Sequence, residues 1–407
     1  MRVCKIKTSA GKRGILYDDW IDDVIEHIIR NRNERQVVLW GKCEAADTIK
    51  TRLKDEYGIE VAFYVVGRSW SKYNDVSVKP SVCLEGKSAD YYVAIPLSVH
   101  PSIKEALLAY GFQKDIDYYY FCDCVIEQRD NYYEDSHGNK LIGHCAGLKF
   151  AFFGFGATLE IGKNVTFQGT TIYLNSGAKV SIGDECSIIE TWMWMRRDGI
   201  FSVKKNGMIM KSTVNVYENS AAKIGSNCVF FQGSLSAMCN VEIGKNIKMR
   251  ECILATGIGA KVNIGDGFTM EHNGVIDIAN HTSLSIGNDC MFSWYVFLLS
   301  GDMHTIFDVA TKININSTPE ISKSRKIKIG NHVWVGAGAS ILYGSEIDDG
   351  SIIGAESLVK GKIPNNCIAA GNPAKIIRRS VAWSRGDGDD DISECGEAYT
   401  RMTEDSI

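Results

Sequence analysis

The chain has 407 residues, enough for two or three domains with a large buried core. Its charged content of 23% is that of an ordinary soluble protein, and its net charge of −4 argues against a nucleic-acid partner, because phosphate binding needs a cationic surface. No apolar run approaches the roughly 18 residues that a membrane span requires, and residues 1–14 lack the apolar core of a signal peptide, so we expect a cytoplasmic protein.

Residues 1–140 alternate helices with strands, which predicts a small α/β domain with a parallel, Rossmann-like sheet. The expected helices are 18–32, 44–58 and 100–111, and the expected strands are 36–41, 60–66 and 90–95. The loop 41–46 after the first strand has one glycine where a dinucleotide fingerprint needs three. Two roles for this domain stay open: binding of a sugar or nucleotide-sugar, and docking.

An isoleucine–glycine pair recurs through the rest of the chain and sets a register. It occurs at Ile161, Ile182, Ile224, Ile243, Ile264, Ile286 and Ile329. The steps are 21, 42, 19, 21, 22 and 43 residues, and Val203 supplies the missing mark in the first double step. This spacing predicts a stack of β-coils over residues 150–380 that share one aliphatic core, in preference to an ordinary β-sandwich.

The second double step, between Ile286 and Ile329, contains one coil and a segment without repeat character. Insertions in repeat proteins emerge as loops, often on the binding face, so we expect a loop insertion at about 305–326. The end of the chain, 386–407, is acidic and poor in apolar residues, which predicts a mobile tail.

A strict six-residue beat runs through residues 327–379, with aliphatic residues at Ile329, Val335, Ile341, Ile347, Ile353 and Val359. The motifs IGNHVWVGAGASIL, SIIGAESLV and IPNNCIAAGNPAKIIRR closely resemble the final coils of hexapeptide-repeat acetyltransferases. That family includes maltose and galactoside O-acetyltransferases and the O-acetyltransferases of bacterial surface polysaccharides. The resemblance implies a left-handed parallel β-helix, a homotrimer with active sites between subunits, and acetyl-CoA as the donor.

The family's general base is a histidine just upstream of the VWIG coil, and His304 is the best positional match. A neutral imidazole can take the proton of a sugar hydroxyl at cytoplasmic pH. Asp302 is the expected partner of the imidazole, with Asp308 as the alternative. The alternative is that His304 is only a polar residue at a corner of the coil. His272 and His281 are weaker candidates, and we expect the next histidine, His332, to pack or cap a corner.

The donor site needs a groove of small residues for the pantetheine arm and cations for the phosphates. The candidates for binding acetyl-CoA are Trp334, Gly336, Gly338, Gly354, Ala355, Ser357, Lys360, Lys375 and Arg378. The resemblance places Trp334 beside the pantetheine arm, and Lys375 takes the basic position after AGNPA. Many family members have Thr-Lys-Asp where this chain has residues 360–362 as Lys-Gly-Lys, so the contacts there differ.

The leading prediction is therefore transfer of acetyl from acetyl-CoA to a sugar hydroxyl of a capsule or lipopolysaccharide. N-acetylation of a nucleotide-linked amino sugar is the alternative. A zinc hydratase and a non-catalytic scaffold are less favoured. We expect no metal: Cys186, Cys228 and Cys290 follow the repeat and should pack inside the coils, and Cys122 and Cys124 form a lone C-x-C.

Overall fold

A computed structural model of the chain describes residues 17–42, 44–66, 71–73, 76–96, 101–114, 116–120, 132–134, 138–152, 156–302, 304–316, 318, 325–386 and 391–404. The Cys122–Cys124 pair lies outside these residues. The chain divides into two compact units, which are built mainly from Met1–Arg129 and Thr158–Ile407. No helix of the described residues has the length and apolar character needed to cross a membrane.

The first unit is the predicted α/β domain, with strand order β3–β4–β2–β1–β5–β6. Its strands are β1 (Gln36–Trp40), β2 (Val61–Val65), β3 (Ser71–Tyr73), β4 (Val76–Lys79), β5 (Tyr91–Ile95) and β6 (Tyr118–Tyr120). Its helices are α1 (Tyr17–Asn31), α2 (Glu44–Tyr57) and α3 (Pro101–Ala109). Every neighbouring pair of strands is parallel except β3 with β4. The strand order reverses between β1 and β5, which is where ligands of such sheets bind.

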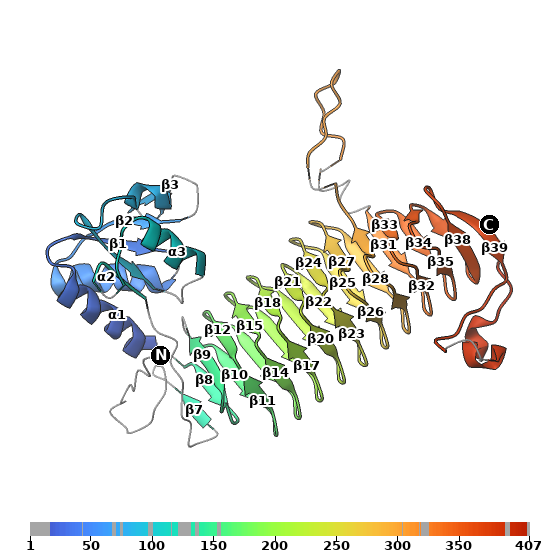
Figure 1. Cartoon of the computed structure of the whole chain (residues 1–407), viewed down its shortest axis with the longest axis horizontal. Helices are drawn as coiled ribbons and strands as arrows, with labels where there is room; N and C mark the ends of the chain where they lie inside the picture. The colour runs from blue at the N-terminus through green and yellow to red at the C-terminus, as the bar shows by residue number, and fades with distance from the viewer. Residues whose placement is uncertain are drawn as a thin grey trace. The chain divides into compact units, whose positions relative to one another are not determined.

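The second unit is the predicted parallel β-helix, built from three long sheets that we name after one strand of each (Figure 1). The β31 sheet contains β7 (Tyr132–Glu134), β8 (Lys140–Ile142), β10 (Thr158–Ile161), β13 (Lys179–Ile182), β16 (Ile200–Val203), β19 (Ala221–Ile224), β22 (Asn240–Ile243), β25 (Lys261–Ile264), β28 (Ser283–Ile286), β31 (Lys326–Ile329), β34 (Ser345–Ile347) and β37 (Lys362–Ile363). The β32 sheet contains β11 (Thr166–Gln168), β14 (Ser187–Ile189), β17 (Met208–Met210), β20 (Val229–Phe231), β23 (Lys248–Arg250), β26 (Thr269–Met270), β29 (Met291–Phe292), β32 (Trp334–Val335), β35 (Ile352–Ile353), β38 (Cys367–Ala370) and the antiparallel β39 (Lys375–Arg379). The β33 sheet contains β9 (Leu148–Phe152), β12 (Thr170–Leu174), β15 (Trp192–Met195), β18 (Thr213–Val216), β21 (Ser234–Ala237), β24 (Ile253–Thr256), β27 (Val275–Ile278), β30 (Phe297–Leu299), β33 (Ser340–Leu342) and β36 (Leu358–Val359).

The isoleucine register of the sequence is the stacking register of the coils. Val203 pairs with Ile182 on one side and with Ile224 on the other, so it fills the place that the spacing assigned to it. Ile286 pairs directly with Ile329, although 43 residues separate them. The insertion therefore leaves the ladder of backbone hydrogen bonds intact on either side of it.

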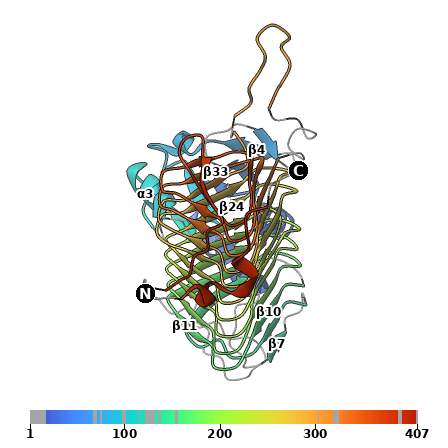
Figure 2. The ribbon, with the colours of Figure 1, turned by 90° about the vertical axis from the view of Figure 1, so that its right-hand side faces the viewer.

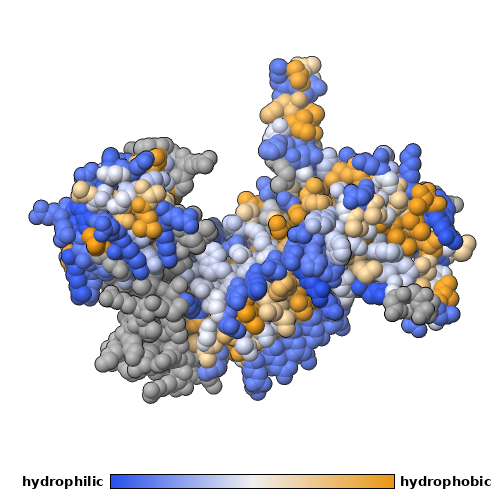
Figure 3. Space-filling view, in the orientation of Figure 1, coloured by the Kyte–Doolittle hydropathy of each residue, from blue (hydrophilic) through white to orange (hydrophobic). Residues whose placement is uncertain are grey.

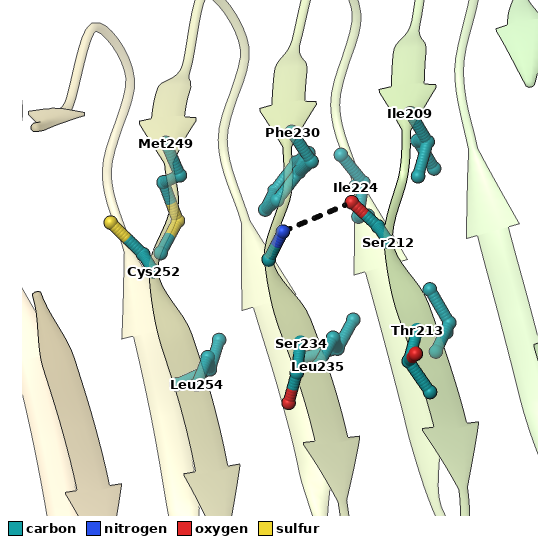
Figure 4. A pocket seen from close by; sticks show the side chains of 12 residues that line it. Ile209, Ser212, Thr213, Ile224, Phe230, Ser234, Leu235, Met249, Cys252 and Leu254 are labelled. Atoms are coloured by element: carbon teal, nitrogen blue, oxygen red, sulfur yellow. Dashed lines mark hydrogen bonds between the residues drawn. The ribbon is translucent and has the colours of Figure 1, made fainter. Parts of the chain in front are cut away.

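The interior of the coils is aliphatic, and the cysteines of the repeat belong to it. Cys186, Cys228 and Cys290 are buried, and burial raises the pKa of the Cys290 thiol to about 12. A cavity of about 20 Å³ lies inside the stack between β17 and β24, lined by side chains such as Phe230, Met249 and Leu254 (Figure 4). It has room for one water and is a packing void, too small for a substrate.

The predicted insertion is an arm, residues 304–316, that stands clear of the coils in both views (Figures 1 and 2). An antiparallel bridge between Phe307 and Asn314 makes it a hairpin, and the Asp308 carboxylate accepts hydrogen bonds from Thr311 at its tip. Figure 3 shows hydrophobic residues along the arm. The exposed apolar side chains of the arm are Ile306, Phe307, Val309, Ile313 and Ile315.

The tail differs from the mobile segment that its composition predicts. Its described part, 391–404, follows a buried Trp383 and returns to the last coils, where the Asn366 side chain donates to the carbonyls of Val381 and Tyr399. The rings of Trp383 and Tyr399 stack on His332, at 4.0 and 4.5 Å between centroids. A few aromatic contacts made far along the chain thus hold an otherwise polar segment on the coils.

Candidate functional site

His304 lies at the root of the arm, with its backbone held and its side chain exposed. Its N–H donates to the Asp302 carbonyl at 2.6 Å, and its carbonyl accepts a hydrogen bond of 2.7 Å from the Asn316 side-chain amide. Within the described part of the chain, no hydrogen bond joins its imidazole to the carboxylate of Asp302 or Asp308. The ring is therefore available to a ligand.

The Asp302 carboxylate has other partners than the imidazole. It accepts hydrogen bonds from Asn316 at 3.0 Å and from the Arg325 guanidinium at 2.8 Å. Burial acts to raise the pKa of Asp302, but the hydrogen bonds from Asn316 and Arg325 outweigh it and hold the pKa below its ordinary value. Asp302 thus reaches His304 through Asn316, and the direct carboxylate–imidazole contact that the sequence suggested does not occur within this chain.

Two cationic side chains and one aromatic ring also lie near the root of the arm. The Arg325 guanidinium lies 4.0 Å from the centroid of the Tyr343 ring, and the Lys360 ammonium lies 4.7 Å from the same centroid. Tyr343 follows β33 and Lys360 follows β36, so both stand where the chain turns from the β33 sheet to the β31 sheet. We call this edge, from which the arm emerges, the arm corner.

The predicted small residues gather at another edge, where the chain turns from the β32 sheet to the β33 sheet, which we call the small-residue corner. The Gly338 N–H donates to the Trp294 carbonyl at 2.9 Å, and the Glu356 N–H donates to the Ala337 carbonyl at 2.8 Å. Ala337 and Ala355 therefore stand one above the other, as do Gly338 and Glu356. Gly336, Gly338, Gly354 and Ala355 lie together there, as the sequence predicts.

Stacking of the coils, besides any ligand, requires glycine at this corner. A Cβ on Gly336 would lie 2.6 Å from the Ala355 nitrogen, and one on Gly354 would lie 2.8 Å from the Ala370 Cβ. Ser357 departs from the prediction, because it is buried and its hydroxyl accepts from the Gly371 N–H at 3.1 Å. Its side chain holds the corner from within and does not line a groove.

The predicted cations divide between the two corners. Lys375 opens β39 opposite Ala370, on the turn whose Gly371 bonds to the small-residue corner, and Arg378 follows on the same exposed strand. Lys360 instead lies at the arm corner over Tyr343. These cations therefore do not form one cluster within a single chain, because alternate turns of the chain carry them to different edges of the coil.

The tryptophan of the hexad motif points outward. Trp334 is 36% exposed on β32, while its neighbour Val335 is buried in the narrow coil. The Trp334 ring lies 6.1 Å from that of Trp383, between centroids. The segment that leads into the tail therefore borders this part of the β32 sheet.

The two corners are the two edges of the β33 sheet, whose outer face is mostly apolar near the arm. Its outward side chains include Ile253, Val275, Phe297, Leu299, Leu342 and Leu358, and the polar Asp277 and Ser340 stand among them. The neighbouring β31 sheet carries polar residues at the corresponding outward positions: Lys261, Asn263, Ser283, Ser285, Lys326 and Lys328. These apolar side chains are only partly buried within one chain. The β33 sheet is therefore the face best suited to pack against another surface.

Several residues at these corners were not found by sequence reasoning. Asn316 and Arg325 lie in the insertion without a motif, and their role depends on where the arm folds back. Trp294 and Tyr295 occupy the small-residue corner of the coil that leads to His304. Their signal was available, since aromatic residues stand there where the next two coils have alanine, glycine and glutamate.

The other histidines are placed apart. His272 lies at the small-residue corner, where its ring is 3.0 Å from the Glu251 carboxylate. His281 lies at the arm corner, one coil before His304. His332 is buried, its Nδ1 donates to the Asp289 carboxylate at 2.6 Å, and the rings of Trp383 and Tyr399 cover it, in agreement with a packing role.

Comparisons with known proteins agree with the coil stack. Residues 326–361 match the family model described as bacterial transferase hexapeptide (six repeats). A polysialic acid O-acetyltransferase of Escherichia coli O1:K1 is 34% identical over 172 residues, which are 40% of this chain and 52% of that protein. A putative lipopolysaccharide biosynthesis O-acetyl transferase of Escherichia coli K12 is 36% identical over 26% of this chain and 56% of its own.

Among solved structures, a polysialic-acid-specific acetyltransferase aligns with 61% of this chain and 93% of its own, with 27% identity and a TM-score of 0.34. The chain spans about half the length of the curated relatives it matches, so the resemblance is one of shared coils.

Proposed function

We propose that this protein is an acetyl-CoA-dependent O-acetyltransferase that acts on a sugar hydroxyl of a bacterial surface glycan. The observation that carries the proposal is an exposed imidazole, His304, whose backbone is fixed at the root of an arm in hexapeptide coils. Relatives named for polysialic acid and lipopolysaccharide support a glycan acceptor of the capsule or lipopolysaccharide class. We place the reaction in the cytoplasm, where acetyl-CoA is made.

The chemistry is a direct transfer. The His304 imidazole takes the proton of a sugar hydroxyl, and the oxygen attacks the carbonyl carbon of the acetyl thioester. The tetrahedral intermediate collapses by breaking the carbon–sulfur bond, and the imidazolium returns its proton to the coenzyme A thiolate. Asp302 acts as a positioning residue through Asn316, which bonds to the His304 carbonyl.

The donor half of the site is proposed at the small-residue corner. Gly336, Gly338 and Ala355 permit close approach of the pantetheine arm, with Trp334 on the adjoining face. Lys375 and Arg378 supply charge for the phosphates on the same side.

The acting species is a homotrimer, and the two corners supply the reason. They are opposite edges of the apolar β33 sheet, so one chain holds His304 and the small residues apart. In a three-fold assembly that buries this sheet around its axis, the arm corner of one copy meets the small-residue corner of the next. Each active site then takes its base from one copy and its donor groove from another.

The test is acetyl-CoA turnover with oligosialic acid, de-O-acetylated lipopolysaccharide and nucleotide-linked amino sugars, with products identified by mass spectrometry. We expect an O-acetyl ester on a glycan, and a loss of at least about 100-fold in kcat for His304→Ala with coenzyme A binding retained. His281→Ala, at the same corner one coil earlier, is the matched control and should keep its activity. Full activity of His304→Ala would remove the mechanism, and an amide product on a nucleotide sugar would favour N-acetylation.

A further inference from the structure

Two aromatic side chains, Trp294 and Tyr295, interrupt the small-residue corner in the coil before Gly336. The Tyr295 N–H donates to the His272 carbonyl at 3.0 Å, and the Gly338 N–H donates to the Trp294 carbonyl at 2.9 Å. Trp294 therefore stands in line with His272 and Ala337, and Tyr295 in line with Gly338. The run of small residues along this edge therefore ends at Trp294 and Tyr295, which we call the aromatic wall.

Both rings face solvent within the chain, since Trp294 is 58% and Tyr295 is 53% exposed. Tyr295 also has a left-handed backbone, with φ of 57°. At this corner the other coils use a polar residue or glycine in that conformation: Glu190, Lys211, Gln232, Glu251, Asn273, Gly338 and Glu356. A bulky aromatic side chain is uncommon there, and residues held in such conformations gather at functional sites.

The wall lies level with the proposed base. Trp294 and Tyr295 lead into β30, which ends at Leu299, and His304 follows five residues later at the root of the arm. These residues thus occupy the two ends of one turn of the coil. In the proposed trimer, whose axis follows the stack, the wall of one copy stands beside His304 of a neighbouring copy.

Polar groups adjoin the wall on its upstream side. The His272 ring lies 6.4 Å from that of Trp294 between centroids, edge to face, and His272 pairs with Glu251 at 3.0 Å. A pyranose has a face of C–H bonds, which stacks on an aromatic ring, and a rim of hydroxyls, which an imidazole and a carboxylate can bind. The arm of a neighbouring copy is a less suitable occupant of this place. Its apolar side chains, such as Phe307 and Ile313, cannot form hydrogen bonds with His272 and Glu251.

We propose that Trp294 and Tyr295 form the acceptor subsite, stacking the pyranose whose hydroxyl is acetylated, while His272 and Glu251 bind hydroxyls of the adjoining sugar. This inference rests on the proposed function, which it deepens by naming the residues that select a glycan. It also gives the small-residue groove an end, so that the acetyl thioester stops at the coil of His304.

The test compares Trp294→Ala and Tyr295→Asn, since asparagine accepts the left-handed backbone that Asn273 already shows. Steady-state kinetics with oligosialic acid and de-O-acetylated lipopolysaccharide should show KM for the glycan raised at least about tenfold, with KM for acetyl-CoA unchanged. Met208→Ala removes another exposed apolar side chain, upstream on β17, and should change neither constant.

Glycan binding is also measured without turnover, by saturation-transfer NMR on wild type and both variants. Binding that is present in wild type and lost in Trp294→Ala supports the subsite even if no acetyl transfer is found, which separates this inference from the proposed reaction. Unchanged glycan binding in the variants, or no binding by wild type, overturns it. So does a change in oligomeric mass by light scattering, because the rings would then be packing on a neighbouring copy.

Discussion

Asn316 donates a hydrogen bond of 3.0 Å to the carboxylate of Asp302, across 14 residues of insertion. The same amide group donates to the His304 carbonyl at 2.7 Å, and the Asn316 oxygen accepts from the Ile306 N–H at 2.6 Å. One buried side chain thus ties both strands of the arm root together and fixes the backbone of the proposed base.

Replacement of Asn316 by alanine is therefore expected to lower kcat by about 10- to 100-fold, because a displaced base loses its attack geometry. KM for acetyl-CoA should stay unchanged, since, among the described residues, the Asn316 side chain bonds only to residues of the arm root and to none that line the proposed donor groove. Thr311→Ala, at the arm tip, is the control and should keep kcat. Steady-state kinetics decide, and an unaltered kcat in Asn316→Ala would contradict the positioning role.

The pH dependence of the arm root follows from Asp302. Burial acts to raise its pKa, but hydrogen bonds from Asn316 and Arg325 hold the folded-state pKa below the unfolded value of about 3.9. A group with a lowered pKa stabilises the fold above its unfolded pKa, and the contribution is lost as pH falls through the folded pKa. The protection of the amide hydrogens of residues 304–316, taken relative to the intrinsic exchange rate at each pH, should therefore fall below about pH 4.

Other carboxylates titrate in the same range, so the measurement is a difference. Asp302→Asn should exchange faster than wild type at pH 7 and should lose the Asp302 part of the acid dependence. Equal acid profiles for the two proteins would show that the ion pair with Arg325 does not hold the arm.

Assembly through the β33 sheet predicts that Phe297→Glu gives monomers and abolishes acetyl transfer. The substitution places a charge on this mostly apolar face, between Val275 and Ser340 of the neighbouring strands, and burial of an unpaired charge is costly. Ser285→Glu makes the same change on the polar β31 sheet and should leave the assembly intact. Light scattering measures the mass, and a trimeric Phe297→Glu would exclude this face.

How far the sequence predicted the structure depended on how local the signal was. The coil register was predicted residue by residue, because the alternation of buried and exposed positions determines which residues of successive coils stack. The Ile286–Ile329 pair is an example. His304 could be proposed as the base because it stands just upstream of a recognisable motif.

Features that depend on long-range contacts were missed. The Asn316–Asp302 bond, the Lys360–Tyr343 contact and the packing of Trp383 on His332 all join segments far apart in the chain. Ser357 was misplaced for a simpler reason: a small residue next to a corner can face either side, and only its bond to Gly371 decides.

The tail, together with the Trp383 that leads into it, should stabilise the last coils. The Trp383 ring is buried against His332, and its indole N–H donates to the His332 carbonyl at 2.9 Å. Trp383→Ala is expected to lower the free energy of unfolding by about 3–5 kcal/mol. Met402→Ala, which removes an exposed side chain from the same tail, should cost little. Urea titration followed by circular dichroism measures both, and equal midpoints would refute a structural tail.

A substitution at Gly336 can distinguish a role in coil stacking from a role in ligand binding at the small-residue corner. A Cβ there would meet the backbone of the next coil, at 2.6 Å from the Ala355 nitrogen and 2.9 Å from the Ile353 oxygen. Gly336→Ala should therefore lower the free energy of unfolding by about 1–3 kcal/mol, since backbone atoms cannot move aside easily. Gly344→Asn is the matched change, because nothing lies near its Cβ and asparagine accepts its positive φ. If Gly336→Ala instead keeps full stability and only raises KM for acetyl-CoA, the glycine serves the donor and not the coil.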